Sequence, residues 1–336
     1  MNGVSTAAKV ARLAYNVSRT RTANKKRYTS GQGVTEQYDK RTIYRKRYMP
    51  KGKKIRWRRF KRKIYAISEK TLGSRTYVVN TQSELLQQTF GLQLVFDLSL
   101  YGFKSTKNRH NDMNELVTKE STTAPSLQTP VQIDDTTKFM FQSGILDLTV
   151  RNTSYNVEGA SQVPIQIEMD VYEIMIGKDT DNTGNDLNDI EDVITKATND
   201  TKQIGGGTGI DTELNIKQRG VTPWDIPVAL SRYRLKILKK TKYFLGSNQT
   251  MTYQYRDPKR RVVTKQRVTE RSGYSRPGWT KTILILAKPV PGYDLGTGDG
   301  KATVRLNVGT TRKYLYKIEG ANQSRDFYLK NVDDNA

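Results

Sequence analysis

The sequence predicts an all-β fold, a sandwich or jelly roll of antiparallel strands that follows a basic N-terminal arm. Three observations lead to this prediction. From about residue 75 onward, β-branched and aromatic residues come in runs of strand length. Clusters of Gly, Pro, Asn and Asp separate these runs. Helical patterns are scarce, which disfavours a parallel sheet with crossover helices.

The expected strands follow one another through the body of the chain. They are 75–80, 92–100, 138–151, 163–176, 233–245, 251–255, 261–268, 280–288, 303–308 and 313–318. Period-two alternation is clear in 92–100 and in 165–171, where apolar and polar side chains face opposite ways, as in half-buried antiparallel sheets. Helical patterns are limited to 83–89, 112–119 and 186–198, with a weak one at 4–17. Loops near 105–135 and 177–222 are long enough to carry function or surface decoration.

Charge divides the chain unequally. Residues 1–75 hold 23 Lys and Arg against three acidic residues, a net charge of +20, whereas the remaining 261 residues hold 34 against 30, a net of +4. Like charges repel and large aliphatic residues are few in this first part, so we expect it to be disordered or partly helical until it meets anions. The sequence therefore predicts a basic arm at 1–63 and a nearly neutral shell-like body at 64–336.

The arm interleaves cations with aromatic residues, most densely between residues 41 and 63. Cations neutralise phosphates without reading sequence, and aromatic faces stack on unpaired bases, so this pattern predicts a single-stranded nucleic-acid-binding segment. The same basic clusters match those that nuclear import receptors read, and a targeting role or an acidic membrane surface are the alternatives. The candidate binding residues are Arg41, Tyr44, Arg45, Lys46, Arg47, Tyr48, Lys51, Lys53, Lys54, Arg56, Trp57, Arg58, Arg59, Phe60, Lys61, Arg62 and Lys63.

A second basic stretch lies in the body. Its cations are Lys259, Arg260, Arg261, Lys265 and Arg267. Three uses remain open from sequence: contacts on the inner surface of a shell, contacts with polyanions outside it, or protection of an edge strand against unwanted pairing. The sequence does not say which way this strand faces.

The residue inventory disfavours an enzyme, a metal site and a cofactor. The chain has no cysteine and a single histidine, His110, which lies in a polar loop and is expected to be an ordinary surface residue. The Gly-rich run 296–302 lacks the spacing of a phosphate loop, and the acidic loop 178–192 lacks the twelfth-position Glu of a calcium loop, so we expect solvated turns. A subunit-interface cation site is the alternative for the acidic loop. No apolar run reaches 18 residues, so we expect no membrane insertion.

Several segments resemble a known protein family in their order along the chain and in their residue pattern. Behind the basic aromatic arm they are 152–154 (NTS), 163–174 (VPIQIEMDVYEI), 230–242 (LSRYRLKILKKTK) and 277–286 (PGWTKTILIL). Together they resemble the capsid proteins of small circular single-stranded DNA viruses that encode a replication initiator, the circovirus-like group and its relatives.

The resemblance implies a single jelly roll of viral capsid type and sixty copies in a T=1 icosahedral shell whose arms point inward onto the genome. It also implies single-stranded DNA as partner, with RNA in heterologous particles, and location in the virion and, during assembly, in the host nucleus. A host nuclear import receptor is then expected as a partner, and a cell-surface receptor of unknown identity. The alternative is a non-capsid nuclear nucleic-acid-binding protein of the shuttle or movement type.

Overall fold

The computed structural model describes residues 50–70, 72–87, 91–122, 133–158, 161–180, 187–204, 215–290, 302–320 and 327–333. The chain divides into two units, Met1–Lys61 and Arg62–Ala336. The helix predicted at 4–17 lies outside the described residues.

The first described element is the helix α2, Lys51–Lys70. It begins directly after Pro50, whose carbonyl accepts a hydrogen bond from the amide of Lys54 at 3.0 Å. Lys and Arg are good helix formers, and Gly52 is the only glycine in the segment. The arm was expected to be disordered or partly helical, but the only helical pattern identified in it was 4–17, so the helix at 51–70 was not predicted.

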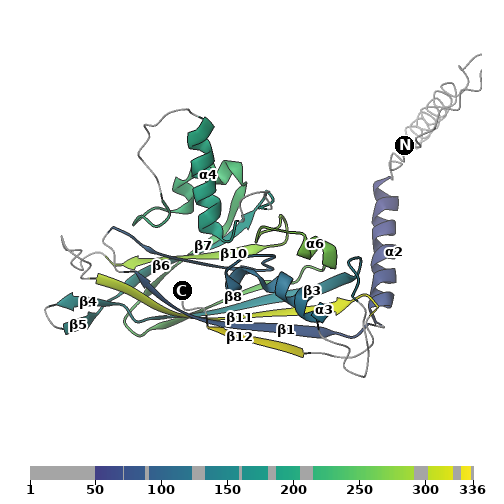
Figure 1. The fold of residues 1–336 in the computed structure, drawn as a ribbon, viewed down its shortest axis with the longest axis horizontal. Helices are drawn as coiled ribbons and strands as arrows, with labels where there is room; N and C mark the ends of the chain where they lie inside the picture. The colour runs from purple at the N-terminus through teal and green to yellow at the C-terminus, as the bar shows by residue number, and fades with distance from the viewer. Residues whose placement is uncertain are drawn as a thin grey trace, which may run out of the picture. The chain divides into compact units, whose positions relative to one another are not determined.

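Two sheets, antiparallel except at one edge of sheet 1, form the body (Figure 1). The strands of sheet 1 are β1 (Arg75–Gln87), β3 (Lys138–Asn152), β4 (Tyr155–Glu158), β5 (Ser161–Pro164), β8 (Thr250–Asp257), β9 (Arg261–Thr264), β11 (Ala302–Ile318) and β12 (Phe327–Asp333). The strands of sheet 2 are β2 (Leu94–Leu100), β6 (Ile167–Ile176), β7 (Leu235–Leu245) and β10 (Lys281–Pro289). Strand β12 pairs with β1 in parallel, at the edge of sheet 1.

The strand order defines a jelly roll. Sheet 1 runs β1-β11-β3-β8 and sheet 2 runs β2-β10-β6-β7. Counting only these eight principal strands in chain order, the sheets read 1-8-3-6 and 2-7-4-5, and successive strands cross between sheets except from β6 to β7, which are neighbours in sheet 2. Two interlocked Greek keys of this kind are the jelly-roll topology. The predicted fold class is confirmed.

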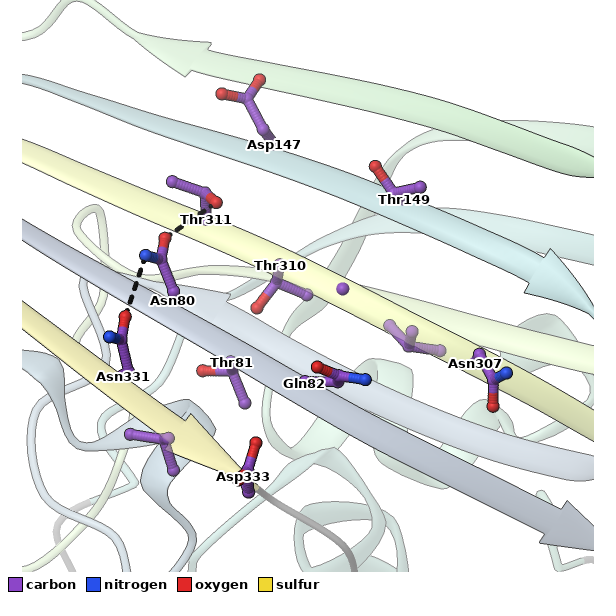
Figure 2. A pocket seen from close by; sticks show the side chains of 13 residues that line it. Asn80, Thr81, Gln82, Asp147, Thr149, Asn307, Thr310, Thr311, Asn331 and Asp333 are labelled. Carbon is purple, nitrogen blue, oxygen red and sulfur yellow. Dashed lines mark hydrogen bonds between the residues drawn. The ribbon is translucent and has the colours of Figure 1, made fainter.

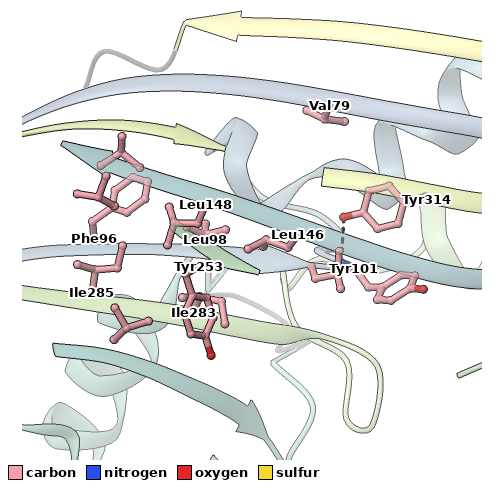
Figure 3. Close-up of a cluster of buried hydrophobic side chains, with 14 of the residues drawn as sticks. Val79, Phe96, Leu98, Tyr101, Leu146, Leu148, Tyr253, Ile283, Ile285 and Tyr314 are labelled. Atoms are coloured by element: carbon pink, nitrogen blue, oxygen red, sulfur yellow. Dashed lines mark hydrogen bonds between the residues drawn. The ribbon is translucent and has the colours of Figure 1, made fainter. Parts of the chain in front are cut away.

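The main core lies between the sheets (Figure 3). Alternation along β1 buries Tyr77 and Val79, while β2 contributes Phe96 and Leu98 from the opposite sheet. One end of this core is closed by α3 (Asp112–Thr122), whose Met113, Leu116 and Val117 are all buried in it. The interior therefore combines a sheet-on-sheet core with a helical plug.

A second core covers the outer face of sheet 2. The connection from β6 to β7 carries α4 (Ile190–Ile204), η2 (Pro223–Asp225) and α5 (Pro227–Arg232), and these pack over Tyr172, Ile174 and Leu284. Figure 1 shows α4 standing over this sheet. Sheet 2 is thus buried on both faces here, contrary to the expectation of half-buried sheets.

Several predicted elements need correction. Residues 83–87, expected in a helix, continue β1, because each of them pairs with β11. The two strands expected at 303–308 and 313–318 are one strand, β11. The strand expected at 261–268 ends at Thr264, where the short helix α6 (Lys265–Thr269) begins. The helices expected at 112–119 and 186–198 are present as α3 and α4, the latter shifted toward the C-terminus.

Candidate nucleic-acid interface

The cations of α2 stand in solvent. Residues 52–60 and Lys63 are all exposed, and because they follow one another along a helix they surround its axis. This brings together the predicted contacts Lys53, Lys54, Arg56, Trp57, Arg58, Arg59, Phe60 and Lys63. Lys51, Lys61 and Arg62 belong to the same helix, whereas Arg41, Tyr44, Arg45, Lys46, Arg47 and Tyr48 lie outside the described residues.

Two aromatic side chains of α2 form one surface. Trp57 and Phe60 are 45% and 52% exposed, and their rings stack with centroids 5.6 Å apart and planes at 27°. Residues three apart share a helix face, which explains this contact. The pair offers a single broad apolar platform surrounded by cations, suited to an unstacked base next to its phosphates.

The charges of α2 oppose one another in the absence of an anion. Between Lys51 and Lys63 the sequence places like charges at three i,i+4 pairs and five i,i+3 pairs. Each such pair costs a helix roughly 0.2–0.5 kcal/mol, so the set costs about 2–4 kcal/mol. A polyanion that neutralises these cations removes that cost and therefore favours the helix.

The second basic stretch separates into exposed and buried members. Lys259 and Arg260 are exposed in the turn between β8 and β9, and Arg267 is exposed on α6. Lys265 is partly buried, 3.3 Å from a carboxylate oxygen of Asp135. Strand β9 lies outside β3 and pairs with it alone among the described strands, as the edge-protection alternative requires.

Arg261 is a correction to the predicted set. Its side chain is 6% exposed, its guanidinium pairs with Asp257, and it donates a hydrogen bond to the carbonyl of Gly278. The guanidinium also lies 5.2 Å from the ring centroid of Tyr101 and 5.3 Å from that of Trp279. These contacts occupy Arg261 inside the body, so it is unavailable to an external polyanion.

His110 is buried, which corrects the prediction of a surface residue. Its Nδ1 lies 3.0 Å from the hydroxyl of Ser99, and its Nε2 lies 3.2 Å from Asp97. The ring of Tyr274 meets it edge-on at 5.1 Å. Ser, His and Asp are the residue types of a hydrolytic triad, but side chains at most 5% exposed leave no path for a substrate. The cluster joins β2 to η1 (Asn108–His110) as a structural element.

Asp97 gives this cluster a pH dependence. Burial alone would raise the pKa of its carboxyl, but His110 and Arg109 beside it and the amide of Ile190 lower that pKa to about 2. Because the folded-state pKa lies below the ordinary value, the stabilisation is present above about pH 4 and is lost as pH falls toward 2. The difference corresponds to about 2 kcal/mol.

We therefore expect Asp97→Asn to lower the free energy of unfolding by about 2 kcal/mol or more at pH 5, with a smaller loss at pH 2. Urea denaturation across this range measures it. Asp134→Asn, at an exposed position, is the matched control and should change little. A constant difference between Asp97→Asn and the parent from pH 5 to pH 2 would contradict the ion-pair interpretation.

The outer face of sheet 1 carries a polar hollow (Figure 2). Its volume is about 450 Å³. Asn80 makes two hydrogen bonds in this hollow: it donates to Asn331 at 3.1 Å and accepts from Thr311 at 3.0 Å. The remaining lining residues include Asp147 and Asp333, and none of them is a lysine or arginine. The hollow is therefore unsuited to a polyanion.

The acidic residues expected in the loop 178–192 are held by neighbours where the structure describes them. Asp179 pairs with Arg271, Asp189 pairs with Lys107, and Asp192 accepts a hydrogen bond from the amide of Asn188 at 2.8 Å. Residues 181–186 lie outside the described part. Within the described part, no three His, Cys, Asp or Glu side chains converge as metal ligands would. Nor is any described helix long and apolar enough to cross a bilayer.

Comparison with known proteins gives little beyond this geometry. No family model and no curated protein matches the sequence. Among solved structures, a chain from Desmodium yellow mottle tymovirus is similar at 7% sequence identity and a TM-score of 0.22, covering 73% of this chain and 90% of that chain. The jelly-roll assignment therefore rests on the strand order of this protein itself.

Proposed function

We propose that this protein is a viral coat protein whose jelly roll assembles into a closed icosahedral shell and whose basic arm binds single-stranded nucleic acid inside it. One observation carries the proposal: a jelly roll with a net charge of only about +4 follows a segment of +20 that ends in an exposed helix of cations and stacked aromatic rings. Jelly rolls occur in viral capsids, lectins and cupins, and the charged arm favours the first of these.

The arm supports the binding role by its chemistry. Exposed Lys and Arg release counterions from phosphates, and the Trp57–Phe60 platform accepts a base without specifying it. If sixty arms faced inward, as the resemblance to circovirus-like capsids implies, their charge would neutralise on the order of a thousand phosphates. Neutralisation on that scale suits the compaction of a small single-stranded genome.

Exposed apolar side chains on the edge strands of both sheets support the assembly role of the body. The edge strand β7 leaves Leu238 and Phe244 47% and 57% exposed, and the edge strand β12 leaves Phe327 and Leu329 63% and 49% exposed. Exposed apolar side chains on opposite sheets are surfaces that neighbouring copies cover in a closed assembly. We expect these four residues to become buried when the shell forms.

We expect the expressed full chain to form uniform particles of small diameter, seen by negative-stain microscopy and by sizing. Shell contacts that bury apolar side chains are not all broken by salt, so particles should persist over a range of ionic strength. A species below about 100 kDa at every salt concentration would contradict the coat proposal. Such a species, if bound to nucleic acid, would favour a shuttle or movement protein instead.

Two finer points belong to the proposal. The clusters Lys51–Lys54 and Arg58–Lys63 have the composition of nuclear import signals, so we expect a host import receptor to bind the arm before the genome does. The cargo expected from the resemblance is circular single-stranded DNA, although phosphate and stacking contacts would bind RNA almost as well.

A further inference from the structure

A strongly basic part of the body lies between the end of β8 and the start of β10. Residues 256–281 hold nine Lys and Arg against Asp257 and Glu270, a net charge of +7. Because the whole chain after residue 75 has a net charge of +4, the rest of the body is acidic overall. This connection therefore carries much of the body's positive charge, and residues 232–242, with six Lys and Arg and no acidic residue, are another basic stretch.

Three arginines of this connection pack against three aromatic rings, which we call the arginine–aromatic column. Arg271 lies 5.1 Å from the centroid of Phe103, and Arg276 lies 5.7 Å from Phe103 and 4.8 Å from Trp279. Arg261 follows, 5.3 Å from Trp279 and 5.2 Å from Tyr101. The rings hold the guanidinium groups in fixed places close to one another.

Carboxylates neutralise only part of this column. Arg261 pairs with Asp257 and Arg271 pairs with Asp179. Arg276 pairs with no carboxylate among the described residues, and its Nη1 is buried without a hydrogen-bond acceptor there. Burial lowers the pKa of Arg276, the neighbouring Arg271, Arg267 and Arg261 lower it further, and Asp179 offsets part of this. Arg276 as a whole is only partly buried, so an anion can lie beside it, and such an anion would offset the repulsion among these like charges.

We propose that Arg276, together with the exposed Arg267, forms a phosphate site for single-stranded nucleic acid on the body, separate from the arm. Guanidinium groups suit phosphate because they offer several donors in one plane. Arg256, Lys259 and Arg260 are exposed in the same connection. The surface therefore offers positive charge for more than one phosphate. A single carboxylate from another copy of the chain would leave most of this charge unpaired. The ring of Trp279 has Arg276 and Arg261 as neighbours, so phosphate contact rather than base stacking is the expected mode.

This site deepens the proposed function, since it would take the same nucleic acid that the arm binds. The test uses the full chain with Trp57→Phe and Trp224→Phe, which leaves Trp279 as the only tryptophan of three. A thymidine oligonucleotide of about 15 nucleotides should change the Trp279 emission saturably, while the anisotropy of a label on the oligonucleotide reports total binding, arm included.

Adding Arg267→Gln and Arg276→Gln should weaken the Trp279 response at least about tenfold and reduce the salt slope of that response by about 1.4, at 0.7 per lost phosphate contact. Arg151→Gln with Lys236→Gln removes the same charge from exposed positions on other strands and should leave the response unchanged. Arg267→Gln alone, at an exposed residue, tests the site even if Arg276→Gln unfolds the chain.

An unchanged Trp279 emission while anisotropy shows binding would overturn this site and leave the arm proposal standing. A saturable Trp279 response, with no binding contributed by the arm, would support this site and overturn the arm proposal. A response to heparin but not to the oligonucleotide would overturn the choice of nucleic acid. If the double arginine variant lost only assembly and kept its Trp279 response, the column would be a contact between copies, and the proposal would fail.

Discussion

Replacing six cations of α2 that the structure describes as exposed with glutamine should abolish most nucleic-acid binding while the jelly roll stays folded. The substitutions are at Lys53, Lys54, Arg56, Arg58, Arg59 and Lys63. If each contacts one phosphate, the slope of log affinity against log salt should fall in magnitude by about 4, because single-stranded binding loses roughly 0.7 per contact. Anisotropy of a labelled oligonucleotide at several salt concentrations measures both the slope and the affinity.

The control removes the same charge from the body. Lys104, Arg151, Lys178, Lys236, Lys239 and Lys313 are exposed and lie outside both the arm and the arginine–aromatic column. Their replacement by glutamine should change binding much less than the α2 variant does. Equal losses in the two variants would mean that only total charge matters, which would contradict a dedicated arm.

The aromatic platform should behave differently from the cations. Replacing Trp57 and Phe60 with leucine keeps the charge and an apolar helix face but removes the stacked rings. Affinity should then fall by about 1–3 kcal/mol per lost base stack, with the salt slope unchanged.

Asp112→Asn should lower the free energy of unfolding by about 3–5 kcal/mol, because it leaves a buried guanidinium without its counter-charge. Asp112 and Arg312 both have fully buried side chains, and the guanidinium donates to the two carboxylate oxygens at 2.6 and 2.9 Å. Tyr314 donates to the same carboxylate through its hydroxyl. Burial alone would lower the pKa of Arg312, and Asp112 more than offsets this, so the net shift is upward. This pair fastens α3 to the core face of β11.

Urea or guanidinium denaturation with an unchanged m-value measures the effect. Asp147→Asn, on the exposed outer face of β3, is the matched control and should stay within about 0.5 kcal/mol of the parent. The double variant Asp112→Leu with Arg312→Met removes both charges and should recover part of the loss. A loss below about 1 kcal/mol in Asp112→Asn would show that water or another group compensates the guanidinium.

Sequence pattern predicted strands with one buried face and also β10, expected at 280–288, which is buried on both faces. In β6 the alternation holds as far as Val171 and then loosens at Tyr172, which is where α4 and α5 begin to cover the second face of the sheet. The loosened pattern was thus a real signal of burial on both sides. The helix α4 was expected at 186–198, but nothing in the sequence of β6 shows that α4 and α5, which come from the β6–β7 connection, pack on this face.

Other errors came from contacts between residues far apart in the chain. Residues 83–89 contain the helix formers Glu84, Leu85 and Leu86, yet pairing with β11 makes 83–87 a strand, since tertiary contacts override propensity. His110 stands in a polar segment, and its burial depends on β2 and on Tyr274, which no local pattern reveals. For the same reason Arg261, one cation among several in sequence, is distinguished only by Asp257 and the rings around it.

The arm shows the opposite case, in which composition alone was informative. Its excess charge predicted an anionic partner, and the strand-poor, cation-rich segment at 51–63 contains good helix formers. What composition did not predict was the stacking of Trp57 on Phe60, because this depends on the segment being helical.

The pairing of β1 has a consequence for synthesis. This first strand of the body is hydrogen-bonded on one side to β11 and on the other to β12, and its partners in β11 lie more than two hundred residues away in the sequence. Sheet 1 therefore cannot close until nearly the whole chain has left the ribosome, and such distant pairing makes folding slow. Under the proposed function, the cationic arm would be available to a polyanion throughout that delay, so it would bind nucleic acid before the jelly roll is complete.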